Sequence, residues 1–120
     1  MSKERVVDVE LVVDGQPVQY PFHFGMSTIR SFAVKKGWVS YPFTKILHGI
    51  IGEEASFIDQ TEFFVEAMKA GKSARKFMTP MPPESDIQEH FPVILKAAAE
   101  TIAAYLTEHK PESKDEPGKD

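Results

Sequence analysis

The sequence predicts an α+β domain in which an N-terminal antiparallel β-hairpin is followed by about four α-helices and a disordered tail. Two segments with apolar residues at every second position flank an Asp-Gly turn. Later segments place apolar residues three and four apart, as on one face of a helix. Residues 110–120 are charged and contain no large apolar side chain. At 120 residues, the chain has the length of one domain. We therefore expect a single domain over residues 1–109 and a disordered acidic and basic tail over 110–120.

The hairpin is predicted by alternation, which puts one face of each strand against a core. The alternating apolar residues are Val7, Val9, Leu11 and Val13 in the first strand, and Val18, Tyr20, Phe22 and Phe24 in the second. Asp14 and Gly15 lie between the strands, where glycine tolerates positive φ and aspartate can bond to the backbone beyond it. Because Pro21 has no N–H, we expect the second strand either to lie at a sheet edge or to pair only through its other residues.

Two helices are expected next, over residues 27–36 and from about 41 to 51. The first has an apolar stripe, and its two terminal lysines and Gly37 suit a helix C-terminus. Trp38 is positioned to pack back over that last turn. The stripe of the second helix consists of Phe43, Ile46, Leu47, Ile50 and Ile51. His48 lies off this stripe and is expected to face solvent.

Two further helices complete the prediction. The third begins at Ser56 or Asp59, since both start a capping-box pattern, and it is expected to end at Gly71. A connector rich in proline follows, because three prolines in four positions exclude a helix interior. The last helix is predicted to be the longest, with Ser85 as its N-cap. Pro92 leaves two alternatives, a kink in this helix or a later start.

The composition excludes several classes of protein. The chain lacks cysteine, so disulfides, thiol catalysis and Cys-ligated zinc are impossible. No apolar run approaches the ~20 residues of a membrane-spanning helix, and the N-terminus does not resemble a secretory signal. A net charge of −4 disfavours binding to nucleic-acid phosphates, although aromatic residues of the second strand could stack on bases. We expect a cytoplasmic protein without a membrane or nucleic-acid partner.

The sequence contains no recognisable catalytic constellation. The four histidines lie in different predicted segments and lack metal-ligand spacing. No serine lies in a GxSxG or SxxK motif, and no glycine-rich loop could cradle a phosphate. We therefore predict a protein that is not an enzyme, with no catalytic residues, no metal ligands and no cofactor.

Two neighbouring features are candidates for partner binding. The first is a basic set made of Lys69, Lys72, Arg75 and Lys76. These cations either complement a helix dipole or form a landing site for an acidic protein segment. The second feature consists of Phe77, Met78 and Met81 in the proline-rich connector. These side chains either tuck under the connector or present a surface that adapts to apolar partners.

Three motifs follow one another at a characteristic spacing. These are the aromatic-Gly step YPFHFGM at 20–26, the helix FFVEAMKAG at 63–71 and the start of the last helix, SDIQE, at 85–89. In the order and spacing of these motifs, the chain resembles the tail assembly chaperones of long-tailed bacteriophages and related prophages over roughly residues 6–108. The chain departs from the family in its Met- and Pro-rich connector and at Pro92.

This resemblance implies a role in virion morphogenesis. Members of the family bind the long, helical tape measure protein before the tail tube polymerises around it. The implied partner is therefore a tape measure protein, bound in the host cytoplasm by several copies or by a homo-oligomer. Two alternatives remain open: a structural tail-completion or connector subunit, and a ubiquitin-like interaction module. The ubiquitin-like fold predicts two further strands after the first helix, where this chain has a helical stripe.

Overall fold

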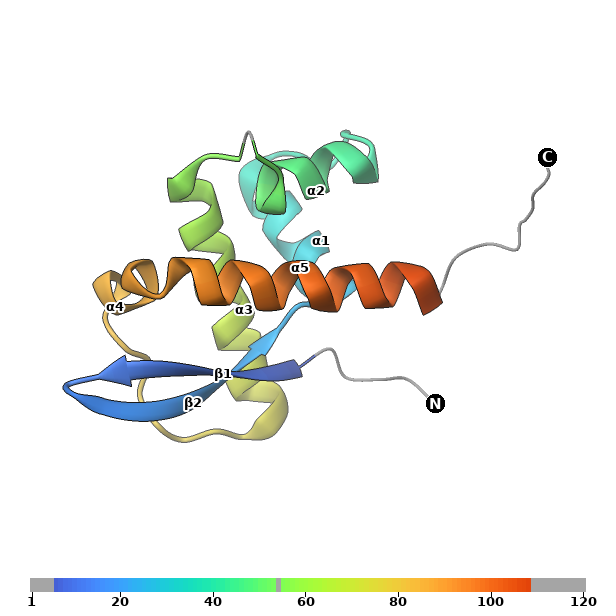
Figure 1. Ribbon diagram of the computed structural model, residues 1–120. Helices are drawn as coiled ribbons and strands as arrows, with labels where there is room; N and C mark the ends of the chain where they lie inside the picture. Colours follow the sequence, from blue (N-terminus) through green and yellow to red (C-terminus); the bar gives the residue numbers. More distant parts are fainter. Residues whose placement is uncertain (1–5, 54, 109–120) are drawn as a thin grey trace.

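A two-stranded hairpin followed by five helices forms the structure, as Figure 1 shows. The computed structural model describes residues 6–53 and 55–108. The elements are β1 (Val6–Val13), β2 (Gln16–His23), α1 (Met26–Lys36), α2 (Phe43–Ile51), α3 (Phe57–Arg75), α4 (Glu84–Glu89) and α5 (Phe91–Glu108). The predicted hairpin and helical architecture is confirmed. The predicted tail at 110–120 lies outside the described residues.

The hairpin tolerates two prolines because of its register. Asp14 and Gly15 both have positive φ, 54° and 78°, and form the two-residue turn. Val13 pairs with Gln16 across this turn, so the hydrogen-bonded pairs alternate from there. Pro17 and Pro21 therefore fall at pairs that exchange no hydrogen bonds, and no ladder bond is lost.

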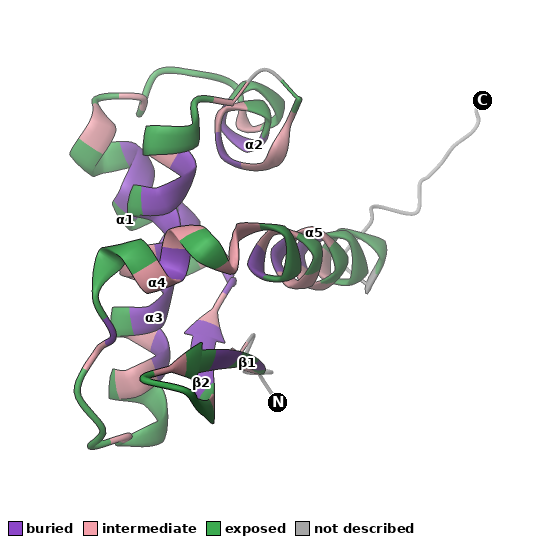
Figure 2. Cartoon of the chain, turned by 60° about the vertical axis from the view of Figure 1, so that its left-hand side comes forward, coloured by how far each residue is buried: buried purple, intermediate pink, exposed green. Residues whose placement is uncertain are grey.

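The core lies between the inward face of the hairpin and the helices. Phe22 and Phe24 from the hairpin side are fully buried, and Phe24 stacks near Phe63 of α3 with ring centroids 6.1 Å apart. Phe63 in turn meets the edge of Phe32 in α1 at 5.4 Å. Figure 2 shows buried residues in β2, α1 and α3. The aromatic chain therefore links the hairpin to α1 through α3.

The predicted end of α3 at Gly71 is wrong. The helix continues to Arg75 and ends at Lys76, which has a left-handed φ of 52°. Gly71 lies where α3 crosses β2, and a Cβ there would overlap the carbonyl oxygen of Pro21 and lie 2.6 Å from its carbonyl carbon. Glycine is needed here because the backbone of α3 approaches the backbone of Pro21 closely. Figure 1 shows α3 crossing the hairpin.

The start of α3 and the end of α1 agree with the sequence, whereas α2 begins at Phe43, with Pro42 as its N-cap, rather than near residue 41. The Ser56 hydroxyl accepts hydrogen bonds from the N–H groups of Ile58 and Asp59, so Ser56 is the N-cap of α3. At the end of α1, Gly37 adopts the left-handed conformation. The Trp38 N–H then bonds to the Ala33 carbonyl at 2.8 Å.

The predicted last helix is two helices rather than one. Pro83, and not Ser85, is the N-cap of α4, and Ser85 lies within that helix. The helix is interrupted at His90, and α5 begins at Phe91 with Pro92 in its first turn. Proline lacks the N–H and clashes with the preceding helical turn, but it is tolerated where a helix begins. The break accounts for five helices instead of about four.

Candidate binding groove

Two cations of the predicted basic set are bound within the chain. Lys69 lies 3.9 Å from Glu66 of the same helix. Arg75 reaches β1, where its guanidinium is 3.2 Å from an Asp8 carboxylate oxygen and donates to the Val6 carbonyl at 3.3 Å. Lys72 is half-buried and Lys76 is exposed. Arg75 therefore fastens the end of α3 to β1.

The proline-rich connector packs on the hairpin. Phe77 meets Tyr20 edge to face with ring centroids 5.7 Å apart, and Met81 is half-buried against the core. The Tyr20 hydroxyl donates to the Pro80 carbonyl at 3.4 Å. Burial raises the pKa of Tyr20, and the nearby negative charges of Asp86 and Asp14 add to this effect. Only Met78, 88% exposed, projects fully into solvent among the three predicted contact residues of the connector.

The described histidines are dispersed, and two of them join elements. His23 Nδ1 accepts from the Gly25 N–H at 3.3 Å and lies 2.6 Å from the Thr28 hydroxyl. His90 Nδ1 donates to the Asp86 carbonyl at 2.7 Å, while its Nε2 accepts from the Val12 N–H at 3.1 Å. His48 is exposed on α2, as predicted. Over residues 6–53 and 55–108, no three His, Asp or Glu side chains are grouped to hold a metal ion.

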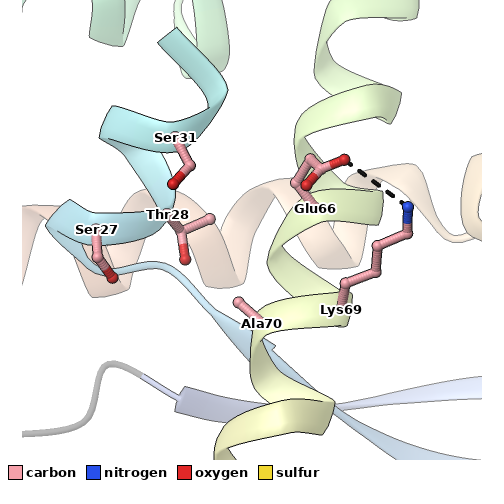
Figure 3. A pocket seen from close by; sticks show the side chains of 6 residues that line it. All are labelled: Ser27, Thr28, Ser31, Glu66, Lys69 and Ala70. Atoms are coloured by element: carbon pink, nitrogen blue, oxygen red, sulfur yellow. Dashed lines mark ion pairs between the residues drawn. The ribbon is translucent and has the colours of Figure 1, made fainter. Parts of the chain in front are cut away.

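Figure 3 shows a polar pocket of about 310 Å³ between α1 and α3. It is lined by Ser27, Thr28, Ser31, Glu66, Lys69 and Ala70. Its charged and buried polar groups already have partners. Thr28 is bonded to His23, and Glu66 pairs with Lys35 and Lys69. These contacts hold the polar side chains of the pocket in place, and its lining residues do not form a catalytic arrangement.

A second, apolar groove lies between α1 and α2. Its volume is about 350 Å³. The lining residues are Met26, Ile29, Arg30, Ala33 and Val34 of α1, Val39 and Tyr41 of the following loop, and Phe43 and Ile46 of α2. These nine residues define the α1–α2 groove. Both helices lie at the end of the molecule opposite the hairpin (Figures 1 and 2).

The floor and the rim of the α1–α2 groove differ in exposure. Ile29 and Ala33 form part of the core beneath it. On the rim, Val34 and Val39 are 59% and 66% exposed, and Tyr41 is also exposed. Single exposed apolar residues are ordinary, whereas several gathered around a groove mark an interaction surface. The α1–α2 groove is therefore the candidate site of this chain.

Trp38 sets the spacing between the walls of the groove. Its ring meets Phe32 of α1 at a right angle, with centroids 5.7 Å apart, and stacks on Tyr41 at 6.3 Å. On the α2 side it lies against Gly49, where an added Cβ would come within 2.9 Å of the indole ring. Glycine thus lets α2 approach the indole, and the loop between the helices is packed in place.

Ion pairs hold the opposite face of α1. Lys36 binds Asp59 at 2.8 Å and Glu62 at 2.9 Å, and Lys35 binds Glu66, all on α3. Hydrogen bonds to Asp59 and then Glu62 raise the pKa of Lys36. Together with the Phe32–Phe63 contact, these pairs fix α1 against α3.

Sequence reasoning missed this groove because its residues come from three segments. Val34 lies beside the predicted apolar stripe of α1, so the helical periodicity did not single it out. One available signal was the composition of the loop, since Trp38, Val39 and Tyr41 crowd apolar side chains into a short connection just before α2. Loops normally run over the surface, so apolar residues in one are candidates for contact.

No family model matches the chain, and searches of curated proteins and of solved structures found no match. Among the described helices, none is both long enough and apolar enough to cross a membrane.

Proposed function

We propose that this protein is a tail assembly chaperone, which binds apolar helical segments of a tape measure protein in the host cytoplasm. The observation that carries the proposal is the α1–α2 groove, with Val34 and Val39 exposed above a floor of core residues. Of the three motifs on which the resemblance to this family depends, the aromatic-Gly step leads into α1 and FFVEAMKAG lies in α3, whereas SDIQE lies in α4 and does not start the last helix. The proposal assigns the chain a binding role and no reaction.

The dimensions of the groove suit a helix. Its α1 wall runs from Met26 to Val34, and eight residues of helical rise span about 12 Å. Two turns of a partner helix have this length and present apolar side chains at i, i+3 or i+4, and i+7. Burying such a stripe removes the surface through which an extended apolar helix aggregates.

The same dimensions favour weak, repeated binding. A contact of two helical turns is small compared with a standard protein interface. Tube subunits can therefore displace each copy, and a long client can hold several copies along its length. The net charge of −4 on each bound copy opposes association between complexes.

Co-expression with a long, helical tape measure protein tests the proposal. We expect a higher soluble yield of that protein and its co-purification with the chain. Val34→Asp should abolish both effects, because it places a charge in the apolar wall of the groove. Val93→Asp is the matched control, since Val93 is also exposed but lies on α5, outside the groove.

Three outcomes would count against the proposal. The first is no gain in soluble client and no co-purification. The second is equal loss in the two valine variants, which would move the site away from the groove. The third is a stable ring of the chain formed without a client, which would favour the structural tail subunit instead.

A further inference from the structure

We infer that the α1–α2 groove selects amphipathic helices whose apolar stripe is flanked by acidic side chains. This inference rests on the proposed function and names the chemistry of the client segment. It depends on the charges around the groove, which differ in sign from the charge of the whole chain.

One cation lines the groove, and a second lies beside it on the ring of a lining residue. Arg30 is part of the α1 wall and is exposed. The structure gives it no ion pair or hydrogen bond within residues 6–53 and 55–108. Lys45 of α2 lies over the ring of Tyr41, with its Nζ 4.2 Å from the ring centroid. None of the nine lining residues is acidic.

The other two cations of α1 have carboxylate partners, so within the described part of the chain only the side of α1 that faces the groove lacks one. Lys35 and Lys36 point to α3, where three acidic residues pair with them. The side of α1 that faces α3 is thus neutralised, and the side that faces the groove keeps the charge of Arg30. A carboxylate arriving with a partner would complete the pairing on this side.

The chemistry of the two cations fits such a partner. The planar guanidinium of Arg30 can take both oxygens of one carboxylate. Lys45 is held near the groove by the face of Tyr41, so a second carboxylate on the other flank of the helix would meet a positioned ammonium. The apolar anchors would then enter between the two charged flanks.

Whether the chain prefers acidic or basic peptides distinguishes recognition by the groove from attraction to the net charge of the chain. A chain of net charge −4 attracts basic peptides at long range. Selection by Arg30 and Lys45 favours acidic peptides instead. A preference for the acidic helix would therefore oppose the overall charge and point to the groove.

Three synthetic helices provide the probes. Each has 18 residues with the same leucine stripe, and the stripe is flanked by Glu in the first, Gln in the second and Lys in the third. The peptides are matched for helix content by circular dichroism. Binding to the full chain is measured by calorimetry at low salt. We expect the Glu peptide to bind about tenfold more tightly than the Lys peptide. The Glu peptide forms two exposed ion pairs with the chain, whereas the Lys peptide places like charges at the same two positions. The Gln peptide should lie between them, and high salt should reduce the differences.

Variants of the chain complete the test. The double variant Arg30→Glu/Lys45→Glu should reverse the order of the three peptides, and Arg30→Gln/Lys45→Gln should remove it. Lys96→Glu is the control, because it replaces one exposed cation of α5 by glutamate outside the groove and should keep the wild-type order. Melting temperatures establish that each variant is folded.

The possible results distinguish the inference from the proposed function. If Val34→Asp abolishes binding but the wild-type chain prefers Lys or shows no order, helix binding stands and acidic selection is overturned. An order that survives both double variants also overturns acidic selection. If no peptide binds, or if Val34→Asp binds all three as the wild type does, both the groove assignment and the inference fail.

Discussion

Replacing Gly71 with alanine tests the close approach of α3 to the hairpin. In an ordinary helix interior this substitution is stabilising by about 1 kcal/mol, because glycine has the poorer helix propensity. Here the new methyl group would overlap the Pro21 carbonyl oxygen and lie 3.0 Å from the Phe22 nitrogen. Both neighbours are backbone atoms of a paired strand, so relief requires α3 to move away from β2.

The two effects have opposite signs, and their sizes decide the outcome. Overpacking a well-packed region costs about 1–3 kcal/mol, and a contact with immovable backbone belongs at or above the upper end. Subtracting the gain in propensity leaves a loss of about 2 kcal/mol. For a domain of this length such a loss lowers the melting temperature by roughly 10 °C.

Thermal and urea unfolding of Gly71→Ala and Ala74→Gly measure this balance. Ala74 is an exposed residue of the same helix, so its change to glycine reports propensity alone and should cost up to about 1 kcal/mol. We expect both variants to be destabilised. A Gly71→Ala protein more stable than the wild type would refute the crossing of α3 over Pro21.

Three further predictions concern the supports of the fold and the groove. Ser56→Ala should lower the free energy of unfolding by about 1 kcal/mol through loss of the α3 N-cap, with Ser40→Ala, in an exposed loop, as a control of no effect in urea titrations. Trp38→Ala should cost about 2–4 kcal/mol and also weaken helix binding, since the indole separates α1 from α2; unchanged peptide affinity in the folded variant would contradict this role. The raised pKa of Tyr20 means that the unfolded chain ionises first, so wild-type stability is intact below its ordinary value of 10.0 and falls as pH rises above it. Tyr20→Phe should flatten this alkaline loss in denaturation curves, and an equal loss in the variant would exclude Tyr20 as the cause.

The parts of the fold that the sequence predicted are those encoded by local chemistry. The turn at Asp14-Gly15 and the cap at Ser56 each depend on a few neighbouring residues, and both are observed. Gly71 illustrates the limit. A glycine near the end of a helical pattern suggests a stop, but its actual role depends on Pro21, fifty positions earlier in the chain. Only the tertiary arrangement distinguishes a stop from a crossing.

The candidate site was harder to predict than the fold for a related reason. The basic residues 69–76 form a visible run, yet Arg75 is bonded to β1. The groove has no such run, because exposure of Val34 depends on which elements leave it uncovered. Local patterns report what a residue favours, whereas a binding surface is defined by what the rest of the chain does not cover.

The supports of the α1–α2 groove explain how it could bind a helix without rearranging. On one side Lys36 fixes α1 to α3, and on the other Trp38 packs between α1 and Gly49 of α2. A preformed groove avoids the ordering of loops and side chains that otherwise reduces affinity. Its rim residues Val34 and Val39 contribute little to the core because they are mostly exposed. Changes at the rim should therefore alter binding while leaving the free energy of unfolding nearly constant, whereas changes at Trp38 should alter both.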